Sequence, residues 1–224
     1  MIGKYYYNLY KKYYAIKRLY SIKLYHVFKY RYVEFINDPL MYIKRDFLPY
    51  NQIVFDVGSQ FGDYALLWEK HYNANVYAFE LLKSNYNVLL NNIRINKSHI
   101  HANNMAIGNS NILDYYIKGN MANQTYVAYN KNHTYSYSID DIAKEYNAIP
   151  DMLKIDVEGF EYDVLWGSIN ILRQFHPKII LEVHTSELFD KCNNFLLSLN
   201  YELKYTDNIR SNGWMDYVAN LYYL

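Results

Sequence analysis

Residues 54–63 read VFDVGSQFGD, an apolar run that ends in an acid and passes into a glycine turn. This pattern predicts a buried strand ending at Asp56, a turn at Gly58 and a helix that begins after Gly62. In an open parallel sheet, ligands bind beyond the carboxyl ends of the strands. Gly58 would let the backbone approach a ligand closely, and Gly62 would let the start of the helix pack tightly. Asp56, at the strand tip, is placed to receive an ammonium group directly or through water.

A second predicted strand also ends in a carboxylate. Residues 76–80 read VYAFE, and Glu80 follows Gly58 by 22 positions. An acid about twenty residues beyond a glycine turn is placed to accept hydrogen bonds from two ribose hydroxyls. The dinucleotide pattern G-x-G-x-x-G is incomplete, since Ser59 and Gln60 follow Gly58, and the sequence contains no P-loop motif. Together the two elements favour a phosphate-free nucleoside cofactor, S-adenosylmethionine (SAM).

Residues 46–224, expected to form the cofactor-binding domain, alternate predicted strands and helices. This alternation is typical of an α/β, Rossmann-like, doubly wound fold with a mostly parallel sheet covered by helices on both faces. Residues 111–137 interrupt it as a β-excursion, after which Ser138 is expected to cap a short helix at Asp141. The predicted strands are 53–56, 75–79, 100–104, 152–156, 178–183, 201–205 and 219–223, and the longer helices are 64–71, 84–95, 161–173 and 186–197.

Residues 1–45 are predicted to be a separate, Tyr-rich helical extension. No acid precedes Glu34, and the basic residues Lys4, Lys11, Arg18 and Lys29 fall on one helical stripe. A basic amphipathic helix over 1–33 could pack on the rest of the chain, form a homodimer contact, lie on an anionic membrane or hold nucleic acid. Packing is favoured over membrane binding because tyrosine hydroxyls are poor hydrocarbon anchors.

Overall composition gives little sign of a charged partner. The formal charge is +1 at pH 7, which creates no general attraction to nucleic acid or acidic membranes. A single cysteine, Cys192, excludes an internal disulfide and is typical of a reducing compartment. No secretory signal is recognisable, and charges interrupt every apolar run well before about 18 residues. A cytoplasmic protein is therefore expected, with a peripheral position at the inner membrane surface as the alternative.

Two further predicted strands end in groups that can carry chemistry. Residues 150–167 read PDMLKIDVEGFEYDVLWG, and residues 177–184 read PKIILEVH. The first strand leads into Asp156 and Glu158, and the second ends at Glu182 and His184. Because the carboxyl ends of parallel strands meet at one edge of a sheet, these side chains are expected at the same pocket as Asp56.

These segments together resemble the FkbM family of SAM-dependent methyltransferases, and the resemblance covers about residues 50–224. It implies a Rossmann-like methyltransferase fold with an antiparallel last strand. It also implies transfer to oxygen, often a hydroxyl of a sugar or small metabolite. The sequence departs from the family at residues 81–84, LLKS, where a proline-containing turn is usual, and in the 1–45 extension. The matching segments are FDVGSQFGDY (55–64), VYAFE (76–80), AIGN (106–109), SIDDI (138–142) and the two segments quoted above.

The candidate site has a cofactor part and a catalytic part. Asp156, Glu158 and His184 are the candidate catalytic residues, because an alcohol acceptor benefits from a base within hydrogen-bond reach. Of these, His184 has the ordinary pKa nearest neutrality. The cofactor pocket is predicted to consist of Asp56, Gly58, Ser59, Gly62, Glu80, Asn104, Ala106 and Asp156.

Two other interpretations of the catalytic part stay open. Asp156, Glu182 and His184 could hold Mg²⁺ or Mn²⁺ that orients a diol, although the expected cofactor set contains SAM and no metal. Alternatively, Asp156 and Glu182 bind cofactor and backbone, and His184 is a structural residue at a strand end.

The sequence thus predicts a methyltransferase that uses SAM to methylate a hydroxyl on a sugar, glycan or small metabolite. An RNA or protein methyltransferase that grips its substrate with the basic N-terminal helix is the first alternative. A non-catalytic nucleoside-binding module is the second, and Asp156 and His184 argue against it.

Overall fold

The computed structural model describes residues 47, 49–118, 121–123, 131–210 and 218–224. The predicted extension over 1–45, including the amphipathic helix over 1–33, lies outside these residues. Within the described ranges, every helix is too short or too polar to cross a membrane.

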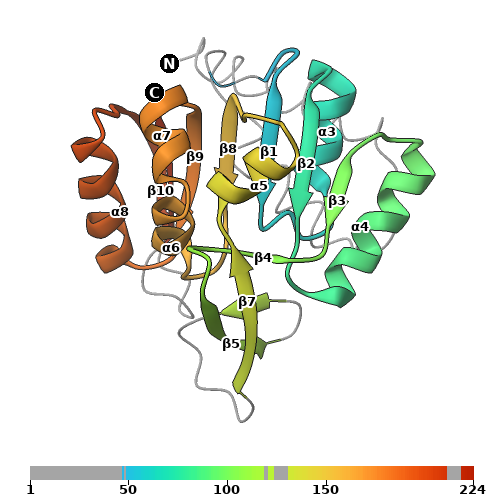
Figure 1. Cartoon of the computed structure of the whole chain (residues 1–224), viewed down its shortest axis with the longest axis horizontal. Helices are drawn as coiled ribbons and strands as arrows, with labels where there is room; N and C mark the ends of the chain where they lie inside the picture. The colour runs from blue at the N-terminus through green and yellow to red at the C-terminus, as the bar shows by residue number, and fades with distance from the viewer. Residues whose placement is uncertain (1–46, 48, 119–120, 124–130, 211–217) are drawn as a thin grey trace, which may run out of the picture.

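Seven strands form the main sheet, in the order β10-β11-β9-β8-β1-β2-β3 (Figure 1). The five neighbouring strands β9, β8, β1, β2 and β3 pair in parallel. Strand β11 runs antiparallel to both of its neighbours, β9 and β10. This arrangement confirms the predicted mostly parallel sheet with an antiparallel last strand. The strands are β1 (Ile53–Val57), β2 (Asn75–Phe79), β3 (His101–Asn103), β8 (Met152–Ile155), β9 (Lys178–Val183), β10 (Leu203–Arg210) and β11 (Val218–Tyr223).

The order of the strands reverses between β1 and β8, which locates the ligand crevice. From β1 the chain builds outward through β2 and β3, and it then returns to place β8 on the other side of β1. In register, Asp56 on β1 is the partner of Lys154 on β8. Open α/β sheets bind their ligands at such a reversal, outside the carboxyl ends of the strands.

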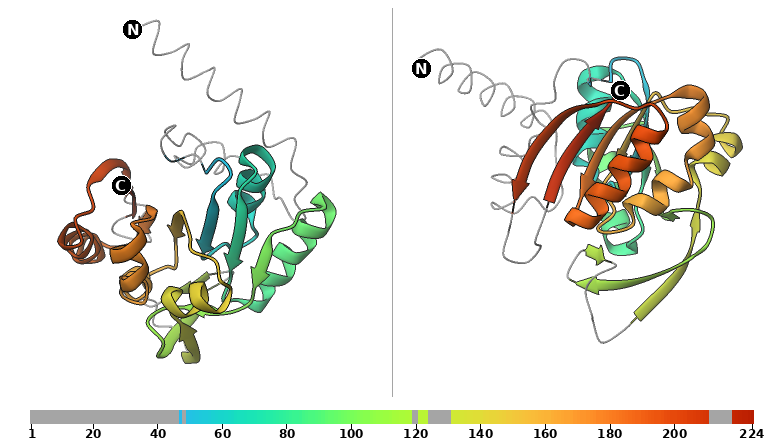
Figure 2. Two further views of the ribbon diagram at one scale, coloured as in Figure 1. Left: turned by 45° about the horizontal axis from the view of Figure 1, so that its top comes forward. Right: turned by 90° about the vertical axis from the view of Figure 1, so that its left-hand side faces the viewer.

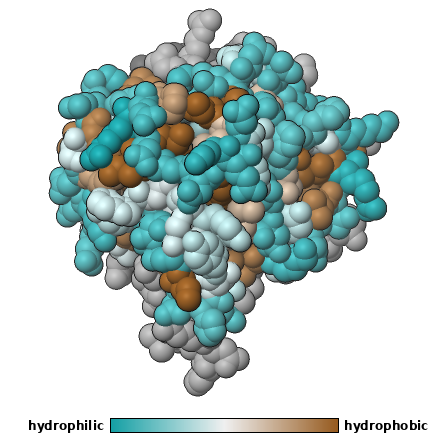
Figure 3. Space-filling model, in the orientation of Figure 1, coloured by the Kyte–Doolittle hydropathy of each residue, from teal (hydrophilic) through white to brown (hydrophobic). Residues whose placement is uncertain are grey.

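Apolar side chains of the central strands point alternately to two cores, as the period of a strand requires. Val54 packs with Trp68 in the core under α3 and α4, whereas Phe55 packs with Ile139 in the core under α5 to α8. Helices therefore cover both faces of the sheet (Figure 2). On the outer face shown in Figure 3, hydrophilic residues predominate and apolar ones form separate groups. The helices are α3 (Asp63–Tyr72), α4 (Lys83–Asn96), α5 (Ile139–Glu145), α6 (Glu161–Trp166), α7 (Ile169–Phe175) and α8 (Ser186–Ser198).

A second, four-stranded sheet forms the predicted β-excursion. Its order is β4-β7-β5-β6, and it lies past the end of the main sheet toward which β2 points (Figure 1). Directly after it, the hydroxyl of Ser138 accepts the N–H of Asp141 at 3.1 Å, which confirms the predicted helix cap. The strands are β4 (Ala106–Ile107), β5 (Ile112–Lys118), β6 (Met121–Asn123) and β7 (Lys131–Tyr137).

The single helix predicted over 161–173 is wrong, because the chain forms α6 and α7 with a break at Gly167. A Cβ atom at Gly167 would overlap the carbonyl oxygen of Gly108, so the loop between β4 and β5 contacts the backbone there. The hydroxyl of Ser168 donates to the carbonyl of Val164 at 2.7 Å. Such local side-chain hydrogen bonds compete with the regular helix ladder. The apolar periodicity of the sequence continues across Gly167, so this pattern does not reveal the break between the two helices.

Candidate active site

The glycine turn after β1 packs against the neighbouring strands. The N–H groups of Gly58 and Ser59 both donate to the carbonyl of Phe79 at 3.0 Å, which joins the turn to β2. Gly58 has a φ of 79°, and a Cβ atom there would overlap the backbone carbonyl of Asp156. The missing side chain at Gly58 therefore makes room for the backbone of Asp156. At Gly62 a Cβ atom would overlap the side chain of Leu89, which confirms the predicted tight packing at the start of α3.

Glu80 connects the loops that follow β1 and β2. Its Oε2 accepts the N–H of Gln60 at 2.9 Å, and its Oε1 accepts the N–H of Leu82 at 2.8 Å. The side chain is only 6% exposed. Burial raises the pKa of Glu80 to about 7, against the opposing effect of these hydrogen bonds. Asn104 stabilises the same loop, since its side-chain amide donates to the carbonyls of Glu80 and Leu81 at 2.8 and 2.9 Å. Ala106 is buried beside this loop.

Lys154, which was not among the predicted site residues, joins the ends of β1 and β8. Its Nζ lies 3.4 Å from Asp56 Oδ1 and 3.3 Å from Asp156 Oδ2, and Lys154 and Asp56 are 3% and 1% exposed. Although burial disfavours its charge, Asp156 and Asp56 raise the pKa of Lys154. Burial also raises the pKa of Asp56. A charged residue inside the apolar strand 152–155, MLKI, was the available signal, because a buried charge needs a partner.

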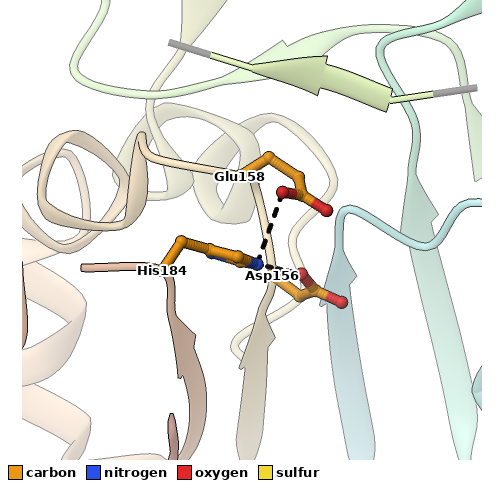
Figure 4. Close-up of side chains that lie close together, drawn as sticks. All are labelled: Asp156, Glu158 and His184. Carbon is orange, nitrogen blue, oxygen red and sulfur yellow. Dashed lines mark ion pairs between the residues drawn. The ribbon is translucent and has the colours of Figure 1, made fainter. Parts of the chain in front are cut away.

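His184 lies at the centre of the catalytic cluster (Figure 4). Its Nδ1 is 2.7 Å from Oε1 of Glu161, a fully buried residue of α6. Its Nε2 faces three carboxylates: Glu158 at 3.5 Å, Glu182 at 3.7 Å and Asp156 at 3.8 Å. The structure therefore brings every predicted catalytic and metal-site residue together. It adds Glu161, which spacing alone had not marked as part of the site.

Charge on His184 follows from this environment. Burial works against the imidazolium form, but the carboxylates of Glu161, Glu158 and Asp156 outweigh it and raise the pKa of His184 to about 10. The ring of the isolated protein is therefore charged at neutral pH. The ordinary pKa of histidine, which is near neutrality, applies to a solvated ring without acidic neighbours.

Glu158 has an unusual backbone conformation. Its φ is 54°, in the left-handed region that glycine favours, and Gly159 follows with a φ of 114°. The N–H of Gly159 donates to Glu161 Oε1 at 2.9 Å, which stabilises the turn. A non-glycine residue in this region costs about 1–3 kcal/mol and is typical of functional sites. This turn brings the Glu158 carboxylate to His184.

Comparisons with known proteins identify the family and the fold. The sequence model of a family described as the methyltransferase FkbM domain matches residues 56–203. A comparison with curated proteins gave no match.

Solved structures share the fold at low sequence identity. An FkbM methyltransferase from Methylobacillus flagellatus KT is 17% identical, with a TM-score of 0.59 over 96% of this chain and 59% of that one. Fibrillarin from Aeropyrum pernix with bound SAM is 13% identical, with a TM-score of 0.53 over 79% of this chain and 68% of that one. TrmK from M. capricolum with S-adenosylhomocysteine is 14% identical, with a TM-score of 0.51 over 80% and 64%. This chain thus spans about three fifths of the Methylobacillus protein.

Proposed function

Because this chain belongs to the FkbM family of methyltransferases, we propose that it transfers the methyl group of SAM to a hydroxyl on a sugar, glycan or small metabolite. One observation carries the proposal. The ammonium group of Lys154 contacts both Asp56 and Asp156, so the end of β1, where the cofactor loop begins, lies next to the catalytic cluster after β8. A methyl donor bound at the cofactor loops and an acceptor bound at the catalytic cluster would therefore be neighbours.

The residues around Glu80 fit the nucleoside part of SAM. Each carboxylate oxygen can accept about two hydrogen bonds, and Oε2 accepts one from the N–H of Gln60. We assign Glu80 to the ribose hydroxyls, which need acceptors. Asp56 lies at the end of β1 and is almost fully buried against Lys154. We assign it to the ammonium group of SAM, which it would reach through water. The remaining wall of the pocket is assigned to Gly58, Ser59, Gly62, Asn104 and Ala106.

Methyl transfer asks mainly for alignment. When bound, SAM supplies a methyl group on a positively charged sulfur, and the acceptor oxygen must lie in line with it. Asp156 and Glu158 are both partly exposed, so their carboxylates can accept a hydrogen bond from an acceptor hydroxyl and take its proton. The charged His184 is a poor proton acceptor, and we assign it to holding these two carboxylates in place.

Calorimetry and an acceptor screen test this proposal. The full chain should bind SAM and S-adenosylhomocysteine in preference to NAD. With sugars, glycans and small alcohols as acceptors, it should produce S-adenosylhomocysteine, and Glu158→Gln should abolish turnover while SAM binding persists. Tight NAD binding without SAM binding would exclude the cofactor assignment. Methylation of RNA or protein, but of no hydroxyl in the screen, would exclude the acceptor class.

A further inference from the structure

We propose that Asp156, Glu158 and His184 form a site for a divalent cation of the Mn²⁺ class. In the reaction proposed above, the cation would hold the acceptor hydroxyl. That role rests on the proposed function, whereas the existence of the site does not. The site differs from the set suggested by the sequence, because Glu158 takes the place of Glu182.

The spacing of the three side chains suits a shared ion better than direct hydrogen bonds. His184 Nε2 is 3.5 Å from Glu158 Oε2 and 3.8 Å from Asp156 Oδ1, at or beyond the longest hydrogen bond. One donor atom from each residue lies within 4.8 Å of the others. Bonds of about 2.0–2.2 Å to a common ion place neighbouring ligands about 3 Å apart and opposite ligands about 4 Å apart. Small side-chain movements would therefore bring all three atoms onto one ion.

A second observation is the orientation of the imidazole. His184 is 6% exposed, and its Nδ1 is 2.7 Å from Oε1 of the fully buried Glu161. Metal-binding histidines almost always donate their other ring N–H to a carboxylate, a carbonyl or water, which orients the ring. The contact with Glu161 occupies Nδ1 and aims Nε2 between Asp156 and Glu158 (Figure 4). The ring is therefore oriented as a ligand would be, and an ion that binds Nε2 would displace its proton.

The turn at Glu158 supports the same assignment. With a φ of 54°, this residue adopts a costly conformation that presents its carboxylate to His184. Glu182 approaches the same nitrogen at 3.7 Å but falls outside the group of mutually close ligand atoms. The charge of Glu182 also acts on Lys154. We therefore place Glu182 beside the ion and not on it.

The donor set indicates the kind of ion. Two carboxylates and one imidazole suit a divalent ion such as Mn²⁺, since Mg²⁺ and Ca²⁺ prefer oxygen ligands and the three-ligand Zn²⁺ sites take at least two of their ligands from His or Cys. Three protein ligands leave coordination positions for water and an acceptor oxygen. A bound cation would polarise the hydroxyl and favour loss of its proton.

Electron paramagnetic resonance can measure the site directly. The full-length protein is treated with EDTA, desalted and titrated with Mn²⁺, and the signal of free Mn²⁺ is followed. One tight site per chain is expected. Glu158→Gln and His184→Gln should each weaken binding by at least tenfold, and Glu161→Gln by about tenfold, the usual effect of losing an outer partner. Glu187→Gln, an exposed carboxylate in the first turn of α8, serves as the matched control and should bind normally.

The outcomes separate this proposal from the proposed function. Circular dichroism first establishes that each variant is folded, and the partly exposed Glu158 offers a variant with little risk to the core. Absence of a tight Mn²⁺ site, or equal binding by the wild type, Glu158→Gln and His184→Gln, overturns the metal site. SAM calorimetry on the EDTA-treated protein tests the cofactor separately. If Mn²⁺ binds and the site variants weaken that binding, but SAM does not bind, the metal site is supported and only its role in methyl transfer is excluded.

Discussion

Lys154 Nζ lies 3.4 Å from Asp56 Oδ1, and both side chains are almost completely buried. The two residues are register partners on β8 and β1, at the reversal of strand order where the ligand crevice begins. Lys154 also contacts Asp156, so a single ammonium group pairs with acids at the ends of both strands. The stability of the sheet and the charge of the candidate site therefore depend on the same residue.

Removal of this charge should destabilise the protein strongly. Lys154→Met leaves Asp56 buried without its cation, and breaking a buried pair in this way costs about 3–5 kcal/mol. Urea unfolding measures the loss. The double variant Asp56→Asn, Lys154→Met should recover part of it, because the uncompensated carboxylate is then absent. Equal stability of Lys154→Met and the wild type would show that the ion pair is unimportant.

SAM affinity should depend on pH through Glu80. Burial raises the pKa of this carboxyl to about 7 in the free protein, and only the ionised form accepts fully from the ribose hydroxyls. Affinity should therefore fall as the pH drops from about 8 to about 6, by at most about tenfold per unit. Glu80→Gln should flatten this profile and weaken binding by about 1–3 kcal/mol. Calorimetry at several pH values measures this profile, with Glu187→Gln as control. If SAM affinity depends on pH in Glu80→Gln as it does in the wild type, another group causes the dependence.

The same pKa shift predicts a pH dependence of folding stability. The pKa of Glu80 is higher in the folded protein, about 7, than its ordinary value of 4.5. The folded state therefore binds the proton more tightly, and this contribution is fully present below pH 4.5. It is lost as the pH rises through about 7. In Glu80→Gln, the change of folding stability with pH, measured by thermal or urea unfolding, should lack this contribution. A pH dependence identical to that of the wild type would contradict the assignment to Glu80.

Two glycine variants should separate backbone overlap from strain. Gly58 and Gly62 have φ values of 79° and 80°, so alanine is similarly strained at both. A new Cβ atom meets a backbone oxygen of Asp156 at Gly58 but the flexible end of Leu89 at Gly62. Gly58→Ala should therefore lose more stability than Gly62→Ala, by about 1–3 kcal/mol, the usual size of such effects. Denaturant unfolding measures the difference in stability. An equal loss of stability in both variants would rule out the close contact between Gly58 and the backbone of Asp156.

Deletion of residues 1–33 tests the prediction that this segment packs. The truncated protein should be less stable, or should lose a dimer in sedimentation, while SAM binding persists. Each Lys or Arg near an anionic membrane would contribute about 1 kcal/mol to vesicle binding. If the truncated chain stays equally stable and monomeric but no longer binds anionic vesicles, the membrane interpretation replaces packing.

The sequence alone determined the type of fold and the positions of the strand tips. The predicted bounds of β2 and β9 agree with the structure, because short apolar runs flanked by polar turns are local signals. Parallel strands end at one edge, so their order along the chain was enough to bring Glu80, Asp156 and His184 to one end of the sheet. Family motifs then indicated the cofactor.

Only the tertiary structure decided which groups in this site touch and which of them are charged. Glu161 contacts His184 across 23 positions, and Lys154 contacts Asp56 across a strand pair. Glu158 reaches the cluster through a left-handed turn that spacing does not reveal. The pKa of His184 is high because the carboxylates of Glu161, Glu158 and Asp156 outweigh the opposing effect of burial. Contacts, burial and charge depend on distance in space, and hydrophobic periodicity along the chain carries no record of them.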